Sequence, residues 1–330
     1  MDPVRLPGPE FLAVLDAGEA FERIVGLECG AVLVEGDDLP DALTPGRQGR
    51  LAMLPAVVVA VVAEPGDRRP EWADVVVAPG RPELAATLAT VEADPLASIT
   101  LAVLLRGAER RSVAEGLVAE SLAYGLLQAG PEFAAWRRGV PRRERPAGDG
   151  PPVLAERHGA ELSITLNRPE VLNAFDAGMR DELVSALQVA VADPSVTSVV
   201  LRGAGGSFCS GGDLDEFGTR PDPATAHLVR LQRSAGRVLA EVADRTTVHI
   251  HGSTVGSGIE LAAFAHQVVA DRGTRISLPE VHLGLIPGAG GTVSLPRRIG
   301  RHATMLLAVG LPWIDAELAR AWGLVDRLEG

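Results

Sequence analysis

Lysine does not occur in this chain of 330 residues, so all 31 of its Lys and Arg residues are arginine. The absence excludes a Schiff-base lysine and the lysine of a phosphate-binding P-loop, and any phosphate contact must come from arginine or from backbone N–H groups. Cysteine is nearly absent as well. Cys29 and Cys209 are far apart and have no metal-like spacing, so we predict neither a disulfide framework nor a zinc site, and we expect a reducing compartment.

Positive charge is scarce relative to negative charge. The 43 acidic residues give a formal net charge of −12, which argues against a nucleic-acid surface, where a basic face would be expected. The apolar run at 56–63 is far too short to span a bilayer, and the start of the chain lacks the pattern of a signal peptide. We therefore expect a cytoplasmic protein with neither a membrane nor a nucleic-acid partner.

The first half of the chain contains short β-branched runs between clusters of Pro, Gly and Asp. The runs at 30–35, 56–63 and 72–78 predict buried strands of an α/β layer. The segment 112–128 predicts an amphipathic helix with Ser112 as its N-cap and Glu115 as the capping-box partner. No catalytic constellation is apparent in this half.

An arginine-rich stretch with Pro, Gly and Asp occupies residues 137–152, and it predicts a solvated linker. We accordingly divide the chain into an N-terminal α/β region at 1–150 and a second unit at 151–330. A charged, exposed connector is favoured for the arginines over a site for the phosphates of an anionic cofactor.

The second half alternates strands and helices. Strands are predicted at 161–167, 196–203 and 247–252, with a helix that Asp176 caps after the first strand and another helix at 224–244. This order is typical of right-handed crossover units in an α/β fold.

Several familiar sites can be set aside. GAGGSF at 203–208 lacks the third glycine of a dinucleotide fingerprint, and no G-x-S-x-G elbow occurs around the nearby serines. Cys209 has no neighbouring base and is predicted to be a small buried residue. His249 and His251 lack a third metal ligand, so packing or hydrogen bonding is favoured. His282, two residues after Glu280, could orient that acid or contact a substrate.

Two glycine-rich loops, SGGDL at 210–214 and GSGIEL at 256–261, each lead into a predicted helix N-terminus. Small residues let a backbone approach a ligand closely, and the first N–H groups of a helix lack intrahelical acceptors. Two such loops can direct two donors at one oxygen, which is an oxyanion hole. Taken singly, each loop is equally explained as a tight turn with a helix cap, and Asp213 suits that capping role.

Glu260 and Glu280 are the candidate acids. Glu260 could be present only because an acid in a first helical turn is favoured by the macrodipole, and Glu280 could be a surface acid after a proline. However, Glu280 lies among apolar residues in LPEVHLGLIP. Such surroundings raise a carboxyl pKa and suit the group to exchange protons near neutral pH.

Together these segments resemble the crotonase superfamily, the enoyl-CoA hydratases and isomerases. The resemblance covers about 152–328 and rests on five segments in the family's order: ITLNRPEVLNAF, VVLRGAGGSFCSGGDLDEF, HGSTVGSGIELAA, PEVHLGLIPGAGGTVSLPRRIG and ARAWGLVDRL. It implies an α/β fold in which ββα units form a spiral, with an acyl-CoA bound across it.

The resemblance also implies roles for individual residues. The oxyanion donors would be the backbone N–H groups of Ser210 and Ser257, where serine at 257 replaces a frequent glycine. Glu260 would activate water for attack at C3 of a trans-2-enoyl-CoA and Glu280 would deliver a proton to C2, and these roles could be shared or exchanged. The substrate-binding residues implied are Gly211, Gly212, Asp213, Gly256 and, for the CoA phosphates, Arg168.

The family's helical tail, which covers the site and builds trimers, is expected after the GLV segment, whereas this chain ends at Gly330. Residues 95–139 resemble that tail, so we hypothesise that the N-terminal half supplies the helical cover in a permuted or fused arrangement. We expect a homo-oligomer, a trimer or a dimer of trimers, that needs no metal or redox cofactor.

Three alternatives to an enoyl-CoA hydratase stay open. They are an enoyl-CoA isomerase, another crotonase reaction on an aromatic or polyketide-derived acyl-CoA, and a non-catalytic partner of an active crotonase.

Overall fold

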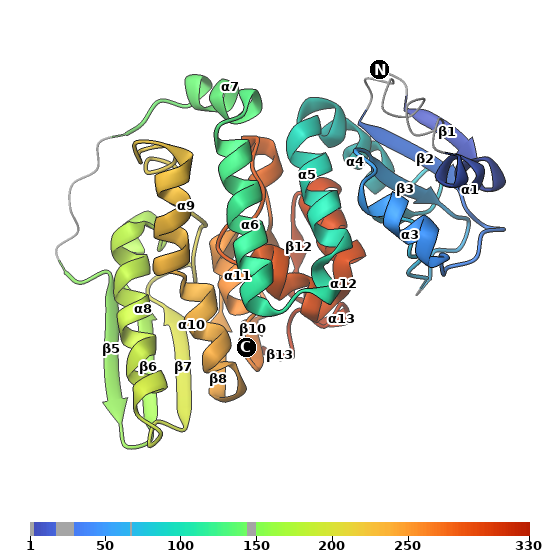
Figure 1. Ribbon diagram of the computed structural model, residues 1–330. Coiled ribbons are helices and arrows are strands. Elements are labelled where there is room, and N and C mark those ends of the chain that lie inside the picture. The colour runs from blue at the N-terminus through green and yellow to red at the C-terminus, as the bar shows by residue number, and fades with distance from the viewer. Residues whose placement is uncertain (1–2, 18–29, 67, 144–149) are drawn as a thin grey trace.

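The computed structural model describes residues 3–17, 30–66, 68–143 and 150–330, and Figure 1 shows its elements in chain order. The N-terminal half forms one small sheet with helices, and the second half contains a larger sheet and a short one. Cys29 and residues 144–149 of the predicted linker lie outside the described residues.

The N-terminal sheet has four parallel strands, which confirms the three strands predicted there and adds one before them. In sheet order they are β1(Val4–Pro7), β2(Ala31–Glu35), β3(Val57–Val61) and β4(Val75–Val77). Side chains of a strand alternate between faces. Val57 and Val59 accordingly join the main core, while Val58 and Ala60 join a separate cluster around Trp72. Helices α1(Gly8–Asp16) and α3(Pro45–Ala52) supply further apolar residues to that separate cluster, as do β1, β2 and the connecting loops.

Four helices follow this sheet: α4(Pro82–Ala93), α5(Pro95–Arg106), α6(Val113–Gln128) and α7(Pro131–Gly139). The predicted capping box is confirmed, because Glu115 N–H donates to Ser112 Oγ and Ser112 N–H donates to Glu115 Oε2. No single helix within the described ranges is long and apolar enough to cross a membrane; α4 and α5 together, bent by 112°, reach that length and composition. Several side chains of α5 are buried in the core.

The second half is organised by a six-stranded sheet whose order is β13-β10-β8-β7-β6-β5. Only β5 runs antiparallel to its neighbour. Its strands are β5(Val153–His158), β6(Glu161–Leu166), β7(Ser198–Gly203), β8(Thr246–Ile250), β10(Gln267–Asp271) and β13(Arg327–Glu329). The predicted strands at 161–167, 196–203 and 247–252 are confirmed to within two residues. Helix α8(Ala177–Ala192) begins after Asp176, which accepts from Met179 N–H as predicted.

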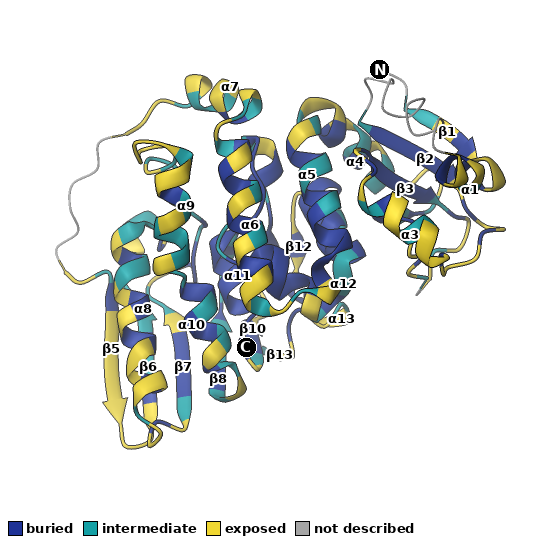
Figure 2. Ribbon diagram, in the orientation of Figure 1, coloured by how far each residue is buried: buried dark blue, intermediate teal, exposed yellow. Residues whose placement is uncertain are grey.

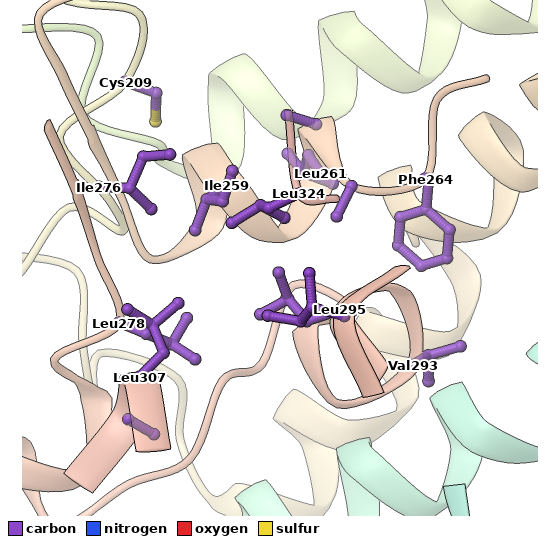
Figure 3. Packing of buried hydrophobic residues seen from close by; sticks show 14 of the residues in the cluster. Cys209, Ile259, Leu261, Phe264, Ile276, Leu278, Val293, Leu295, Leu307 and Leu324 are labelled. Atoms are coloured by element: carbon purple, nitrogen blue, oxygen red, sulfur yellow. The ribbon is translucent and has the colours of Figure 1, made fainter. Parts of the chain in front are cut away.

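A three-stranded sheet lies next to the large one, and its strands are β9(Ser253–Val255), β11(Arg275–Ser277) and β12(Ile314–Asp315). The remaining helices are α9(Pro223–Gln232), α10(Ala235–Glu241), α11(Ser257–Ala262), α12(Gly291–Val309) and α13(Ala316–Ala321). Figure 3 shows part of the core of this half, in which Ile259 and Leu261 of α11 belong to one cluster with Leu278 and Leu295.

The long helix predicted at 224–244 is wrong in one respect. It is two helices, α9 and α10, because Arg233 leaves helical geometry and Ser234 starts the second helix by accepting from Arg237 N–H. After the break α10 packs against α8, and Val238 and Leu239 are buried.

The two halves of the chain pack directly on each other. Helix α6 lies beside α9 and α12 in Figure 1, and Figure 2 shows buried residues where α5 and α12 meet. Gly116 makes the close approach of α6 possible, since a β carbon there would lie 2.8 Å from Val293 Cγ2 of α12. The N-terminal half therefore reaches the same region as the second half's glycine-rich loops.

Three arginines of the predicted connector bind SGGDL and the residues that follow it. Arg137 Nη1 donates to Leu214 O at 2.6 Å, and Arg142 Nη2 donates to Phe217 O at 3.2 Å and to Gly218 O at 3.0 Å. Arg143 pairs with Asp215. Arg138, Arg142 and Arg143 are exposed, as predicted for a charged connector. The prediction missed that residues 137–139 are the end of helix α7 and that backbone carbonyls of a distant loop accept from Arg137 and Arg142.

Candidate active site

A cavity of about 530 Å³ lies where the two halves meet. Helix α6 of the N-terminal half forms one wall, and α9, α10 and the loops at 212–220 and 288–290 form the others. Both predicted acids, Glu260 and Glu280, line this cavity together with Ser257, Gly212 and Asp213. Tertiary structure therefore gathers residues from both halves around one space.

The two glycine-rich loops lie side by side at the cavity. Val255 N–H donates to Cys209 O at 2.9 Å, and Cys209 and Thr254 form an isolated parallel bridge. Gly256, at φ 48°, turns the chain from this bridge into α11. A β carbon at Gly256 would lie only 2.1 Å from Glu280 Oε1, so glycine is required both by the backbone conformation and by the approach of that carboxyl.

One of the two predicted oxyanion donors needs correction. Ser210 N–H already donates to Leu172 O at 2.9 Å, so it is not free to bind a ligand. Gly212 and Ser257, by contrast, donate no backbone N–H hydrogen bond to any residue that the structure describes, and both line the cavity. The geometry therefore favours Gly212 and Ser257 as the donor pair.

The prediction that both loops lead into helices holds for only one of them. Helix α11 starts at Ser257, but SGGDL enters a turn and the next helix begins at Pro223. Asp213 is not a helix cap. Its Oδ1 accepts from Asp215 N–H at 3.1 Å and its Oδ2 lies 3.4 Å from Arg168 Nη2, so it orders the turn.

Glu260 is 2% exposed and is held as an acceptor. Its Oε2 accepts from Ala289 N–H at 2.7 Å and from Gly291 N–H at 2.8 Å, at the start of α12. Burial raises the pKa of Glu260, while these two donors oppose the rise. Donors to the charged form and the positive end of a helix dipole favour the carboxylate, so Glu260 is suited to accept a proton.

Glu280 is 8% exposed and has the opposite surroundings. Its Oε2 is buried without a hydrogen-bond partner in the described part of the chain. Burial, followed by the nearby Glu260, raises the pKa of Glu280 well above its ordinary value. Its own backbone N–H is a donor that opposes this rise, but a buried carboxyl with an unpartnered oxygen is favoured in its protonated form, so Glu280 is suited to give a proton.

A third acid, Glu120 of α6, was not predicted from the sequence. It is 2% exposed, and it accepts from Gly290 N–H at 2.8 Å, Thr292 N–H at 3.0 Å and Thr292 Oγ1 at 2.8 Å. Glu260 and Glu120 thus bind alternate N–H groups of one loop. Burial, and then Glu260, raises the pKa of Glu120. An acid within the predicted apolar face of helix 112–128 was the available signal.

Three other residues discussed from the sequence, Arg168, His282 and Cys209, do not line the cavity. Arg168, expected at the CoA phosphates, does not line the cavity; its Nη1 pairs with Asp176 Oδ2 at 2.6 Å. His282 is exposed and lies 3.9 Å from Asp94. Cys209 is fully buried, as predicted, and burial raises the pKa of its thiol to about 11.

His249 and His251 each have one polar neighbour and belong to no set of metal ligands among the described residues. His249 lies 3.5 Å from Glu329, and His251 Nε2 lies 3.0 Å from Gly205 O. Throughout the described ranges, no group of three or more His, Cys, Asp and Glu side chains could hold a metal ion.

A family model described as enoyl-CoA hydratase/isomerase matches residues 156–329. The chain is 34% identical over 174 residues to the 2,3-dehydroadipyl-CoA hydratase of Escherichia coli (strain K12), covering 53% of this chain and 68% of that protein. It is 34% identical over 178 residues to the 1,2-epoxyphenylacetyl-CoA isomerase of the same organism, covering 52% and 68%. Against the peroxisomal bifunctional enzyme of Danio rerio the identity is 36% over 167 residues, 50% of this chain but only 22% of that enzyme.

Solved structures resemble the same half. The enoyl-CoA hydratase of Thermoplasma volcanium GSS1 aligns with a TM-score of 0.50 at 31% identity, over 55% of this chain and 72% of that one. DspI of Pseudomonas aeruginosa aligns with a TM-score of 0.51 at 28% identity, over 56% and 70%. These likenesses agree with the expected spiral of ββα units.

Proposed function

Because the chain belongs to the enoyl-CoA hydratase/isomerase family, we propose that it adds water to a trans-2-enoyl-CoA to form a 3-hydroxyacyl-CoA. One observation carries the proposal. Two carboxyl groups of opposite hydrogen-bonding character line one cavity: Glu260 has two N–H donors, and Glu280 has an oxygen without a partner among the described residues. Two backbone N–H groups with no acceptor in that same part of the chain lie beside them. Pairs of acids whose surroundings differ in this way divide the roles of base and acid between them.

In the proposed reaction Glu260 acts as the base. Its carboxylate accepts a proton from water as the oxygen attacks C3, and the electron pair of the double bond moves toward the thioester carbonyl. The resulting enolate oxygen is bound by the N–H groups of Gly212 and Ser257. Donors fixed in advance stabilise that negative charge without reorganisation.

Glu280 then completes the addition by giving its proton to C2. The turnover leaves Glu260 protonated and Glu280 ionised, so a proton must pass from the first acid to the second before the next cycle. Both acids are buried and lie in one cavity, which supports such a return. The two groups titrate as a coupled set, so a pH profile reports values of the set.

The test is hydration of a short trans-2-enoyl-CoA, followed by loss of enoyl-thioester absorbance. Glu260→Gln and Glu280→Gln are each expected to lower kcat by about 10²- to 10⁴-fold, the usual contribution of a general acid or base. Glu161→Gln, which changes an exposed acid on β6, serves as the matched control and keeps wild-type turnover.

Hydration that proceeds unchanged in either glutamine variant would refute the assignment. A 3-enoyl-CoA is assayed in parallel, because the chain is similar to a protein named as an isomerase as well as to one named as a hydratase. Turnover of that substrate alone would replace hydration by isomerisation, and binding without turnover of either would favour a non-catalytic partner.

We further propose that the protein is a cytoplasmic homo-oligomer that uses no metal or redox cofactor. Apolar side chains exposed on α6 and α9, namely Val118, Leu122, Leu126 and Leu228, support contacts between copies. Light scattering coupled to size-exclusion chromatography measures the assembly, and a monomer at micromolar concentration would contradict it.

A further inference from the structure

Arg230 of α9 is a cation in the cavity wall that the proposed hydration does not use. It is partly buried and lines the cavity together with Glu260 and Glu280. Burial lowers the pKa of its guanidinium. A cation taken out of water without an ionic partner is costly, so its presence in this wall needs an explanation.

Arg230 is held in a defined orientation by α6. Its Nε donates to Ser121 Oγ at 2.9 Å and its Nη2 donates to Ser121 O at 3.1 Å. Its guanidinium also lies over the ring of Tyr124, with Cζ 4.8 Å from the centroid. These contacts fix the group while leaving Nη1 without a hydrogen bond to any described residue.

No carboxylate neutralises Arg230 within the part of the chain that the structure describes, because none lies within 4.0 Å of its nitrogens. Glu120 is the carboxylate whose charge raises the pKa of Arg230. However, its two oxygens already accept from Gly290 and Thr292. Arg230 therefore has no carboxylate in direct contact among the described residues, although the charge of Glu120 acts on it from a greater distance.

The position of Arg230 connects it to the reacting end of the cavity. Tyr124, on which it stacks, packs so closely on Gly288 that a β carbon there would lie 2.5 Å from the tyrosine ring. Gly288 immediately precedes the loop that binds Glu260 and Glu120. The Tyr124 hydroxyl makes no hydrogen bond to any described residue, so a second polar group beside Arg230 also has no protein partner.

We propose that this site accepts acyl-CoA substrates whose acyl chain ends in a carboxylate, bound by Arg230 with help from the Tyr124 hydroxyl. The inference rests on the proposed acyl-CoA function and adds a substrate class to it. A guanidinium binds a carboxylate through paired N–H donors, and such charge-assisted bonds are strong where water is excluded. A phosphate of CoA offers the same chemistry, so the experiment separates the two sources.

The experiment measures binding by calorimetry, so it does not depend on turnover. Saturated dicarboxylic acyl-CoAs from succinyl-CoA to sebacyl-CoA are compared with methyl-terminated acyl-CoAs of equal chain length and with free CoA. At the best length, we expect the wild-type protein to bind the carboxylate-ended ligand at least ~10-fold more tightly than its methyl-ended match, as for a desolvated charge pair. Arg230→Met should bring that ratio close to one, and Arg230→Lys should restore part of it.

The control is Arg202→Met, which removes the same charge from β7, outside the cavity lining, and it should keep the wild-type ratio. A wild-type ratio near one at every chain length would overturn the proposal. Equal weakening of both series and of free CoA by Arg230→Met would also overturn it, since the anion would then be a CoA phosphate. If hydration is absent but the ratio holds, only the proposed reaction fails; if hydration occurs without a ratio, only this inference fails.

Discussion

Two clusters of buried ionisable side chains lie at the contact between the halves of this molecule. One pairs its acid with arginines, and the other gives its acids backbone N–H donors. In one, Asp74 of the N-terminal half pairs with Arg106 at 2.5 Å, both almost fully buried, and Arg301 of α12 lies 3.5 Å away. In the other, three glutamates share a cavity wall, and no cation among the residues that the structure describes is bonded to any of their oxygens.

The paired cluster satisfies almost all of its hydrogen-bonding groups. Arg106 also donates to the carbonyls of Leu51, Leu54 and Ala56, and Asp74 accepts from Val58 N–H. Burial alone would raise the pKa of Asp74, but its arginine partners and this N–H bring it below the ordinary value. The cluster holds the N-terminal sheet to α12 in a single ionic state.

In the glutamate cluster the protonation state changes near neutral pH. Burial raises the pKa of all three acids, and their mutual repulsion adds to the rise for Glu120 and Glu280. Its partners are backbone N–H groups rather than cations. The contrast shows that similar acids at similar depth become structural or reactive according to whether opposite charge is supplied beside them.

The largest effect should come from breaking one partner in each cluster. Asp74→Ala leaves Arg106 buried without its counterion and is expected to lower the free energy of unfolding by about 3–5 kcal/mol. Glu280→Gln removes a buried acid whose Oε2 has no partner among the described residues, so it should leave that free energy unchanged or raise it, although it lowers turnover strongly. Urea unfolding of the two variants measures the difference, and equal destabilisation would show that the two clusters do not differ as described.

The pH dependence of stability should come next in size. His302, which lies 3.0 Å from Pro70 O beside the paired cluster, is neutral in the fold because burial, and then Arg301, lowers its pKa to about 4. The unfolded chain takes up a proton below pH 6.5, so stability should fall by roughly 2–3 kcal/mol as the pH drops from 6.5 toward 4.

The glutamates predict the opposite slope on the alkaline side. Burial raises the pKa of Glu260 to about 7 and that of Glu120 to about 8, so the fold retains protons that the unfolded chain loses above pH 4.5. The contribution of these acids should therefore decline as the pH rises from about 4.5 to about 7–8 and stay level above that range, so it opposes the His302 effect where the two ranges overlap. Thermal melts at a series of pH values check both contributions: His302→Gln should remove the gain in stability between about pH 4 and 6.5, and Glu280→Gln should reduce the loss that continues up to about pH 8. An exchange of these effects would refute the assignment.

The smallest effect concerns Glu120. Glu120→Gln keeps an acceptor for Gly290 and Thr292 but removes a charge that raises the pKa of Glu280. The pH at which kcat/KM falls on the alkaline side, where Glu280 loses its proton, should then decrease by less than about one unit. Glu115→Gln, on the same helix but exposed, is the control and should leave the limb in place, as would Glu120→Gln if that acid had only a capping role.

The sequence revealed the features whose cause is local. Asp176 and Ser112 were identifiable as caps because capping depends on residues a few positions away. Glu260 and Glu280 could be named because glycine-rich and apolar neighbours accompany them, and the resemblance gave their order. The choice of Ser210 as a donor was wrong because the carbonyl that occupies its N–H belongs to Leu172, on another loop.

By itself, then, the sequence determined the family, the crotonase-like core and the two acids of the proposed reaction. Only the tertiary structure decided what completes the site. Glu120 meets Gly290 and Thr292 across 170 and 172 positions of sequence, and Arg230 is held over Tyr124 by Ser121, 109 positions away. Such pairings follow from how whole helices pack, and no local pattern around either residue specifies the partner that the fold brings to it.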